Sequence, residues 1–215
     1  MSTRAIGGRQ PTETQMQNVL VLQNSANLEN SVSRRLVDAY VSEFQKSKPG
    51  ATVAVRDLVR NPIPHIAPVL INHQITGAGD PQDPNVALSD ALIEELEAAD
   101  IVVIGAPFYN FTIPSTLKAW LDNVVRAGRT FQYVDGAPVG LLPRGKKVIV
   151  FLASGGAYTE APGSAADFFE PYLRFILGVI GLTDVEFVRS ELQVVPELGQ
   201  RNTEVALEKA KALAL

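Results

Sequence analysis

Three serines stand between the first apolar run of this sequence and its first amphipathic segment. The run is Val19–Leu22, and the serines are Ser25, Ser31 and Ser33. A short uninterrupted apolar run is typical of a strand buried on both faces, and apolar residues then repeat at helical spacing from Ser33 to about Lys46. The serines therefore lie at a helix N-terminus, where free backbone N–H groups and the helix dipole favour an anion. Their hydroxyl groups predict a seat for a terminal phosphate, although Ser31 or Ser33 acting only as a helix cap is the alternative.

Two further loops carry residues suited to a flat aromatic ligand. Pro107–Phe111 follows the apolar run Ile101–Ala106, and Ser154-Gly155-Gly156 follows the run Lys146–Ala153. Aromatic and amide side chains beside exposed backbone can cover a heterocycle, and paired glycines let the main chain approach it closely. The alternative is that these aromatic residues belong to the core. One phosphate seat and one flat ring together describe FMN, whereas FAD would need a second phosphate site.

Several other chemistries are not supported by the sequence. There is no cysteine, which excludes disulfides, thiolate metal sites and a cysteine nucleophile. His65 and His73 lie apart in a proline-rich stretch, so we expect solvated histidines and no metal site. The segment Gly140–Lys147 resembles a nucleotide-phosphate loop but precedes a strand where that motif must follow one, and neither Gly-x-Gly-x-x-Gly nor Gly-x-Ser-x-Gly occurs. A formal net charge of −4 and the lack of a long apolar run predict no nucleic-acid partner and no membrane span.

The elements around these loops alternate between strand and helix. Thr52–Leu58 is predicted as the second strand and Val185–Arg189 as the fifth. This alternation predicts an α/β fold with a five-stranded parallel sheet and helices on both faces. Ligands bind such sheets at the C-terminal strand ends, where the three loops converge. We expect one domain over residues 18–215, preceded by a flexible extension over residues 1–17.

The sequence also predicts the structure of two connections and one helix. The proline-rich residues 59–88 are predicted to form a long functional or contact loop, after which Ser89 caps a helix. Residues 128–145 are predicted to be irregular apart from a short strand at Thr130–Val134 and a turn at Asp135-Gly136. One interpretation of this insertion is that it protects an edge of the sheet. The predicted helix Asp167–Ile180 is expected to turn the following side chains inward: Phe168, Tyr172, Phe175, Ile176 and Val179.

Taken together, these motifs resemble the FMN-dependent NADH:quinone oxidoreductases, also called FMN-dependent NADH azoreductases, of the flavodoxin-like superfamily. The resemblance covers nearly all of residues 18–215. It rests on the following segments: Ser31-Val32-Ser33, Arg56-Asp57-Leu58, Asn61–Pro64, Ala106–Phe111, Thr116–Asp122, Arg126–Gly128, Thr130-Phe131 and Gly140-Leu141.

The resemblance implies a flavodoxin-like fold that binds FMN and uses NADH or NADPH to reduce quinones or azo compounds by two-electron ping-pong transfer. The flavin would carry the chemistry, so no side chain is assigned as a catalytic acid or base. The family commonly has Ser-Arg-Gly-Gly where this chain has Ala153-Ser154-Gly155-Gly156, which keeps the glycines and changes the first two residues. The residues expected to bind the cofactor are Ser25, Ser31, Val32, Ser33, Pro107, Phe108, Tyr109, Asn110, Phe111, Ser154, Gly155, Gly156 and Tyr158.

The resemblance also implies a homodimer in which the partner completes each active site, with residues 59–88 and 128–145 as candidates for that surface. Because residues 1–17 lack the apolar centre of a signal peptide, we expect a cytoplasmic protein. Two other functions stay open from the sequence. One is a flavodoxin-like electron carrier without a substrate pocket, and the other is a flavin-binding regulatory or structural dimer without turnover.

Overall fold

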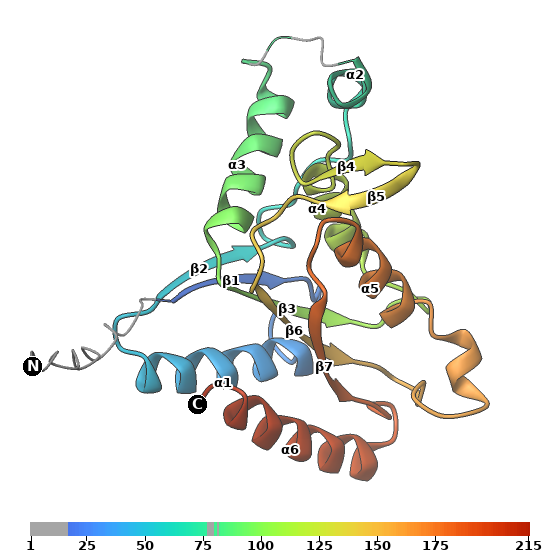
Figure 1. The fold of residues 1–215 in the computed structure, drawn as a ribbon. Coiled ribbons are helices and arrows are strands. Elements are labelled where there is room, and N and C mark those ends of the chain that lie inside the picture. Colours follow the sequence, from blue (N-terminus) through green and yellow to red (C-terminus); the bar gives the residue numbers. More distant parts are fainter. Residues whose placement is uncertain (1–16, 77–79, 81) are drawn as a thin grey trace, which may run out of the picture.

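A computed structural model describes residues 17–76, 80 and 82–215, and Figure 1 shows its fold. The expected N-terminal extension, apart from Gln17, lies outside the described residues. The elements of the main sheet and its helices are β1 (Asn18–Gln23), α1 (Val32–Ser47), β2 (Thr52–Asp57), α2 (Pro68–Thr76), α3 (Pro84–Ala98), β3 (Ile101–Pro107), α4 (Ser115–Val124), β6 (Lys147–Ala153), α5 (Glu170–Val179), β7 (Asp184–Ser190) and α6 (Pro196–Ala212). The strands β4 (Phe131–Val134) and β5 (Ala137–Gly140) form a separate hairpin.

The five-stranded sheet is parallel throughout, with the strand order β2-β1-β3-β6-β7. This confirms the predicted fold class. The chain first winds outward from β1 to β2 and then returns to place β3 on the other side of β1. The winding therefore reverses between β1 and β3, and the C-terminal ends of these two strands border the crevice where such sheets bind ligands.

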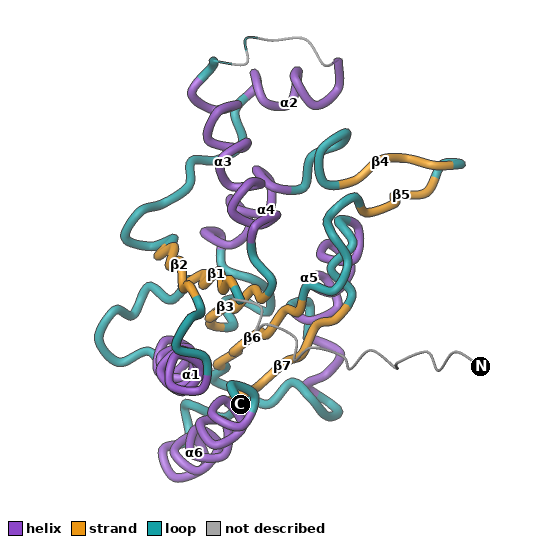
Figure 2. Tube along the Cα trace, turned by 60° about the vertical axis from the view of Figure 1, so that its left-hand side comes forward, coloured by secondary structure: helices purple, strands orange, loops and turns teal. Residues whose placement is uncertain are grey.

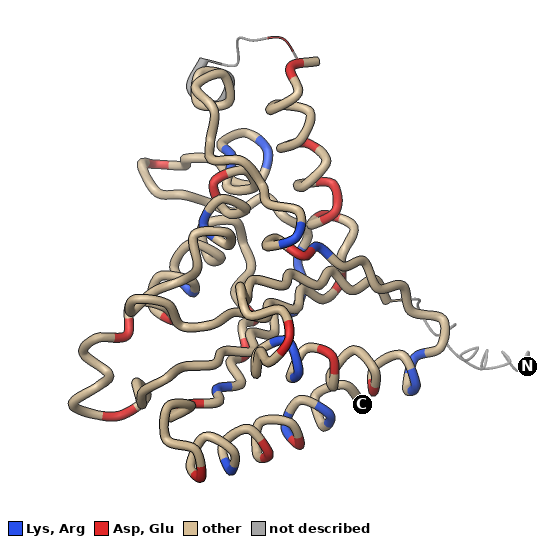
Figure 3. Tube along the Cα trace, turned by 180° about the vertical axis from the view of Figure 1, so that it is seen from behind, with Lys and Arg blue, Asp and Glu red and all other residues tan. Residues whose placement is uncertain are grey.

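Helices cover both faces of the sheet, because alternate residues of each central strand point to opposite sides. Val21 and Val103 share a core with Leu36 and Tyr40 of α1, and α6 packs on the same face. On the other face lie α3, α4 and α5, whose core includes Trp120 (Figure 2). Acidic and basic residues are interspersed along the outer helix α6 (Figure 3). Of the helices in the described ranges, none is long and apolar enough to cross a membrane.

The connection between β2 and β3 differs from the prediction. The helix α3 begins at Pro84, and the carboxylate of Asp83 caps it by accepting a hydrogen bond from the Asn85 N–H at 2.8 Å. Ser89 lies buried inside this helix and donates to the Asn123 carbonyl at 2.6 Å, so the predicted cap is wrong. Residues 59–88 also contain α2, and are therefore not one continuous loop. His73 lies in α2, but its side chain is outside the described part of the chain.

The insertion 128–145 is more regular than expected. Asp135 and Gly136 form the predicted tight turn, with φ values of 51° and 80°, as a two-residue hairpin turn requires. Pro138 and Gly140, predicted to keep the segment irregular, belong to β5 and pair with β4. A two-stranded ribbon tolerates proline because each strand has one unpaired edge.

The helix α5 begins later than predicted, and two of the five side chains predicted to face inward are exposed. The N-cap residue is Phe169, and the Asp167 carboxylate, two residues earlier, accepts hydrogen bonds from the backbone N–H groups of Phe169 and Glu170 at 2.9 and 3.1 Å. The fully buried side chains include Phe169, Leu173 and Leu177. Phe168 and Phe175 are 62% and 68% exposed, which contradicts their predicted burial. Tyr172, Ile176 and Val179, which were also predicted to face inward, are partly buried and pack against the core.

Candidate functional site

The serines after β1 are gathered at the start of α1. Ser25, Ser31 and Ser33 are all buried, and the hydroxyl oxygens of Ser31 and Ser33 lie 3.1 Å apart. Ser31 is the N-cap, and its hydroxyl accepts a hydrogen bond from the Arg34 N–H at 3.3 Å. The N–H groups of Val32 and Ser33 have no acceptor within the helix, as in any first turn. Capping and anion binding are therefore compatible here, since the hydrogen bond between the two hydroxyls uses one of their protons and leaves the other to donate.

A carboxylate at the end of β2 borders this serine loop. The Asp57 carboxylate accepts hydrogen bonds from Arg34 at 2.7 and 3.0 Å and from the backbone N–H groups of Val59 and Arg60 at 3.1 Å each. Burial raises the pKa of Asp57, but these hydrogen bonds and the Arg34 charge outweigh burial and hold the pKa below its usual value of 3.8. The Asp57 side chain is therefore negatively charged at neutral pH, and it neutralises the Arg34 guanidinium beside the serine loop.

The loop after β3 is a tight turn with strained backbone. Tyr109 and Thr112 exchange both backbone hydrogen bonds, at 3.2 and 3.1 Å. The two residues between them, Asn110 and Phe111, have φ values of 45° and 70°. Asn tolerates this left-handed region, whereas a bulky residue such as Phe rarely adopts it. Such strain is concentrated at functional sites, and here it leaves Tyr109 and Phe111 40% and 49% exposed.

An aromatic cluster joins this loop to the loop after β6. Tyr158 stacks on Phe108 with ring centroids 4.2 Å apart and an interplanar angle of 25°. Phe111 meets both rings edge-on, at 6.4 Å from Phe108 and 6.1 Å from Tyr158. Phe108, Phe111 and Tyr158 thus meet, and they come from the two loops that were predicted to converge.

The glycines after β6 support the stacked tyrosine. Ser154 is buried and its hydroxyl donates to the Gly156 carbonyl at 2.8 Å, which fixes the turn. A Cβ atom at Gly156 would lie 3.2 Å from the Tyr158 ring, tighter than ordinary van der Waals contact, and one at Gly155 would lie 3.1 Å from the Val194 side chain. Pro107, at the end of β3, pairs with Ala153 at the end of β6. The two ring-side loops therefore start from adjacent strand ends.

Known proteins match this arrangement over almost the whole chain. The family model for the flavodoxin-like fold matches residues 17–214. The FMN-dependent NADH:quinone oxidoreductase of Hyphomonas neptunium is 49% identical over 177 residues, which cover 82% of this chain and 85% of that protein. This chain belongs to the FMN-dependent NADH:quinone oxidoreductase family. The family resemblance predicted from the sequence is confirmed.

Solved structures agree with that assignment. An azoreductase from Bacillus anthracis has a TM-score of 0.84 and 29% identity, over 93% of this chain and 99% of that one. An FMN-dependent NADH-azoreductase from Bacillus anthracis, solved in complex with FMN, has a TM-score of 0.81 and 25% identity, over 93% of this chain and 100% of that one.

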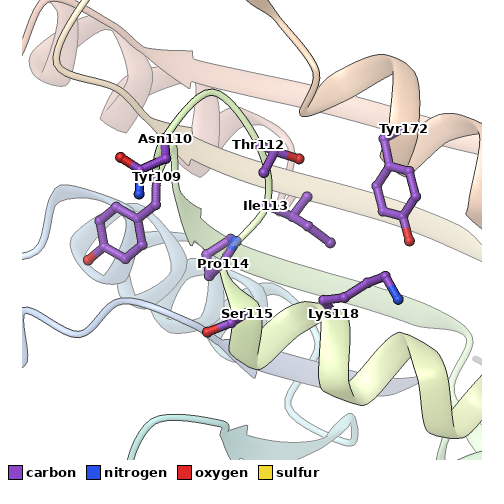
Figure 4. A pocket seen from close by; sticks show the side chains of 8 residues that line it. All are labelled: Tyr109, Asn110, Thr112, Ile113, Pro114, Ser115, Lys118 and Tyr172. Atoms are coloured by element: carbon purple, nitrogen blue, oxygen red, sulfur yellow. The ribbon is translucent and has the colours of Figure 1, made fainter. Parts of the chain in front are cut away.

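This family member also has a cavity that the sequence did not predict. Its volume is about 550 Å³, and it lies between the loop after β3, the start of α4 and the helix α5. Figure 4 shows Tyr109 and Asn110 at one end and Lys118 and Tyr172 at the other. Burial raises the pKa of Tyr172, so its hydroxyl stays protonated. The full lining is Tyr109, Asn110, Thr112, Ile113, Pro114, Ser115, Lys118 and Tyr172.

The structure thus places the predicted site residues in two groups. Ser25, Ser31, Val32 and Ser33 form the serine loop at the end of β1. The residues Pro107 to Phe111 and Ser154 to Gly156, with Tyr158, meet at the ends of β3 and β6. The sequence did not reveal that Asn24 joins the end of β1 to β3 and α4. Its side chain donates a hydrogen bond to the Gly105 carbonyl at 3.2 Å and accepts one from Thr116 at 3.4 Å. The signal available was an asparagine directly after a buried strand, but its partners come from β3 and α4.

Proposed function

We propose that this protein is an FMN-dependent oxidoreductase that uses NADH or NADPH to reduce quinones and azo compounds by two-electron ping-pong transfer. The observation that carries the proposal is the joint presence of three buried serines and an aromatic cluster at the ends of the neighbouring strands β1, β3 and β6. The names of the relatives support the same activity.

The donor set fits one phosphate. Three buried serines and the free N–H groups of the first turn of α1 supply hydrogen-bond donors at the positive end of a helix dipole. Anion binding at such a site needs no lysine in direct contact. We therefore assign Ser25, Ser31, Val32 and Ser33 to the FMN phosphate.

The two ring-side loops fit a flat heteroaromatic group. Phe108, Tyr109, Phe111 and Tyr158 supply aromatic surface, Asn110 supplies an amide, and the absence of a side chain at Gly156 lets the Tyr158 ring lie against the main chain. When bound, the flavin supplies the hydride and electron-pair chemistry. The chain binds and orients it, and its loop N–H groups supply the positive environment that favours a reduced ring.

The cavity beside Tyr109 gives the acceptor a place to bind. Its volume of about 550 Å³ lies within the range of roughly 300–1,000 Å³ that small-molecule sites have. Its walls are mostly apolar, and they include the polar side chains of Asn110, Thr112, Ser115, Lys118 and Tyr172. Such a cavity suits a flat acceptor that carries oxygen substituents, and its presence favours a reductase over an electron carrier.

We propose that the protein is a homodimer. Three aromatic side chains are largely exposed: Tyr133 on β4, Phe175 on α5 and Phe168 before it, at 68%, 68% and 62%. The hairpin and α5 are adjacent, since a Cβ atom at Gly140 would lie 2.2 Å from the Gly181 nitrogen just after α5. Exposed aromatic surface of this kind is typical of protein interfaces. The cytoplasmic location stays a prediction from the sequence.

The proposal is tested by the purified full-length protein. We expect a flavin absorption spectrum with one phosphate per flavin, and NADH oxidation that a quinone stimulates. A protein that binds FMN but shows no stimulated NADH oxidation would be a carrier or a non-catalytic dimer. A colourless protein that takes up no added FMN would refute the proposal.

A further inference from the structure

Arg34 lies in the first turn of α1, and its guanidinium is turned back into the protein. Only 12% of its side chain is exposed. The Nε and Nη2 groups donate to the Ser25 carbonyl at 3.2 and 2.8 Å. The Nη1 and Nη2 groups donate to the Asp57 carboxylate at 2.7 and 3.0 Å. One planar side chain thus binds two acceptors, a geometry that a lysine ammonium cannot reproduce.

The two acceptors belong to different segments. Ser25 follows β1 and opens the serine loop, whereas Asp57 ends β2. These strand ends are themselves joined, because the Leu58 N–H donates to the Gln23 carbonyl at 2.9 Å. Arg34 therefore fixes the peptide of Ser25 relative to the first turn of α1, where Ser31 and Ser33 lie.

We propose that Arg34 is a positioning residue for the phosphate seat. This inference rests on the proposed function, because it assumes that FMN binds there. Arg34 acts through geometry, since its charge is already paired with Asp57 and its donors are used within the protein. By holding the Ser25 peptide in place before the ligand arrives, it reduces the conformational entropy that this loop loses when the ligand binds.

The test compares two flavins that differ only in the phosphate. Full-length protein stripped of flavin is titrated with FMN and with riboflavin, which has the same ring and no phosphate. For Arg34→Gln we expect FMN to bind about tenfold more weakly, with riboflavin affinity unchanged within about twofold. Arg34→Lys keeps the charge but loses the fork, and should weaken FMN binding by about threefold or more.

Arg35→Gln is the matched control, because it removes the same charge from the next, exposed residue. It should leave the ratio of the two affinities at the wild-type value. An unchanged ratio in both Arg34 variants would overturn the inference and make the residue merely structural. An equal loss in Arg35→Gln would also overturn it, by showing that charge and not geometry matters. Failure of the wild-type protein to bind FMN is a separate result, which would remove the proposed function and this inference together.

Discussion

The loops that follow β1 and β3 start from neighbouring strands of one sheet, yet they are held in different ways. The serine loop is held by side chains: Asn27 accepts hydrogen bonds from the N–H groups of Glu29 and Asn30 at 3.3 and 2.9 Å, and Arg34 holds Ser25. The loop after β3 is held by its own backbone, through the paired hydrogen bonds of Tyr109 and Thr112. Its two central residues adopt left-handed conformations.

This difference separates two tasks. The serine loop uses polar side chains both to shape itself and to offer donors, so substitutions there should affect recognition of a phosphate. In the loop after β3 the backbone provides the shape, which leaves the aromatic side chains free to cover a ring. Substitutions among the aromatic residues should therefore weaken FMN and riboflavin equally, whereas those in the serine loop should weaken FMN alone.

The largest expected effect follows from removing both helix-end hydroxyls. Ser31→Ala combined with Ser33→Ala should weaken FMN binding by about a hundredfold, because two hydrogen bonds to a charged group are lost. Riboflavin affinity should stay close to wild type in the same titration. The loss of the N-cap should also lower the free energy of unfolding by about 1 kcal/mol. Ser42→Ala, an exposed serine of the same helix, is the control, and unchanged FMN binding in the double variant would place the phosphate elsewhere.

A second effect concerns pH and the support of the serine loop. Because the pKa of Asp57 lies below 3.8 in the folded protein, its stabilising contribution is present above about pH 4 and is lost as the pH falls through the folded-state pKa. Asp57→Asn should lower the free energy of unfolding by about 2 kcal/mol at pH 7, since it leaves the Arg34 charge without its partner. Urea unfolding at pH 7, 5 and 3 should show the difference from wild type shrinking below pH 4. A difference that is the same at all three values would contradict this assignment.

The two loops also show which features a sequence can predict. The strands β1, β3 and β6 were predictable because buried parallel strands need continuous apolar runs. The cap at Ser89 was wrong because Asp83 is equally suited to capping, and only Pro84 at the first helical position favours the earlier start. The predicted burial of Phe168 and Phe175 was wrong because Phe168 and Phe169 are consecutive, and apolar residues occur on both sides of α5.

The site was predictable to the extent that its residues are close in sequence. Ser31 and Ser33 lie within one turn of α1, and the residues from Phe108 to Phe111 lie in one loop, so local patterns revealed both. Lys118 and Tyr172 line the same cavity from α4 and α5, and their proximity depends on how those helices pack. The bonds from Arg34 to Ser25 and Asp57 likewise join segments that come together only in the folded protein.

A third effect tests the aromatic cluster of Phe108, Phe111 and Tyr158. Gly156→Val would place side-chain atoms against the Tyr158 ring, where even a Cβ atom would lie 3.2 Å away. Displacing Tyr158 from Phe108 should weaken FMN and riboflavin binding alike, by about tenfold, because stacked aromatic contacts contribute roughly 1 kcal/mol each. Gly178→Ala serves as the control, since a Cβ atom there meets nothing within 4 Å. A loss confined to FMN would contradict the division between the two loops.

The smallest effect isolates the backbone of the loop after β3. Asn110 has a φ of 45°, a conformation that glycine adopts freely, asparagine tolerates and alanine does not favour. Asn110→Ala should therefore lower the free energy of unfolding by about 1 kcal/mol, whereas Asn110→Gly should change it by less than about 0.5 kcal/mol. Both variants remove the same amide, so flavin titration separates its role from that of the backbone.

If both weaken flavin binding equally while only Asn110→Ala loses stability, the amide contacts the ring and the left-handed turn acts only as its support. If only Asn110→Ala binds flavin weakly, the turn itself positions Tyr109 and Phe111. Equal stability of the two variants would show that strain plays no part in shaping this loop.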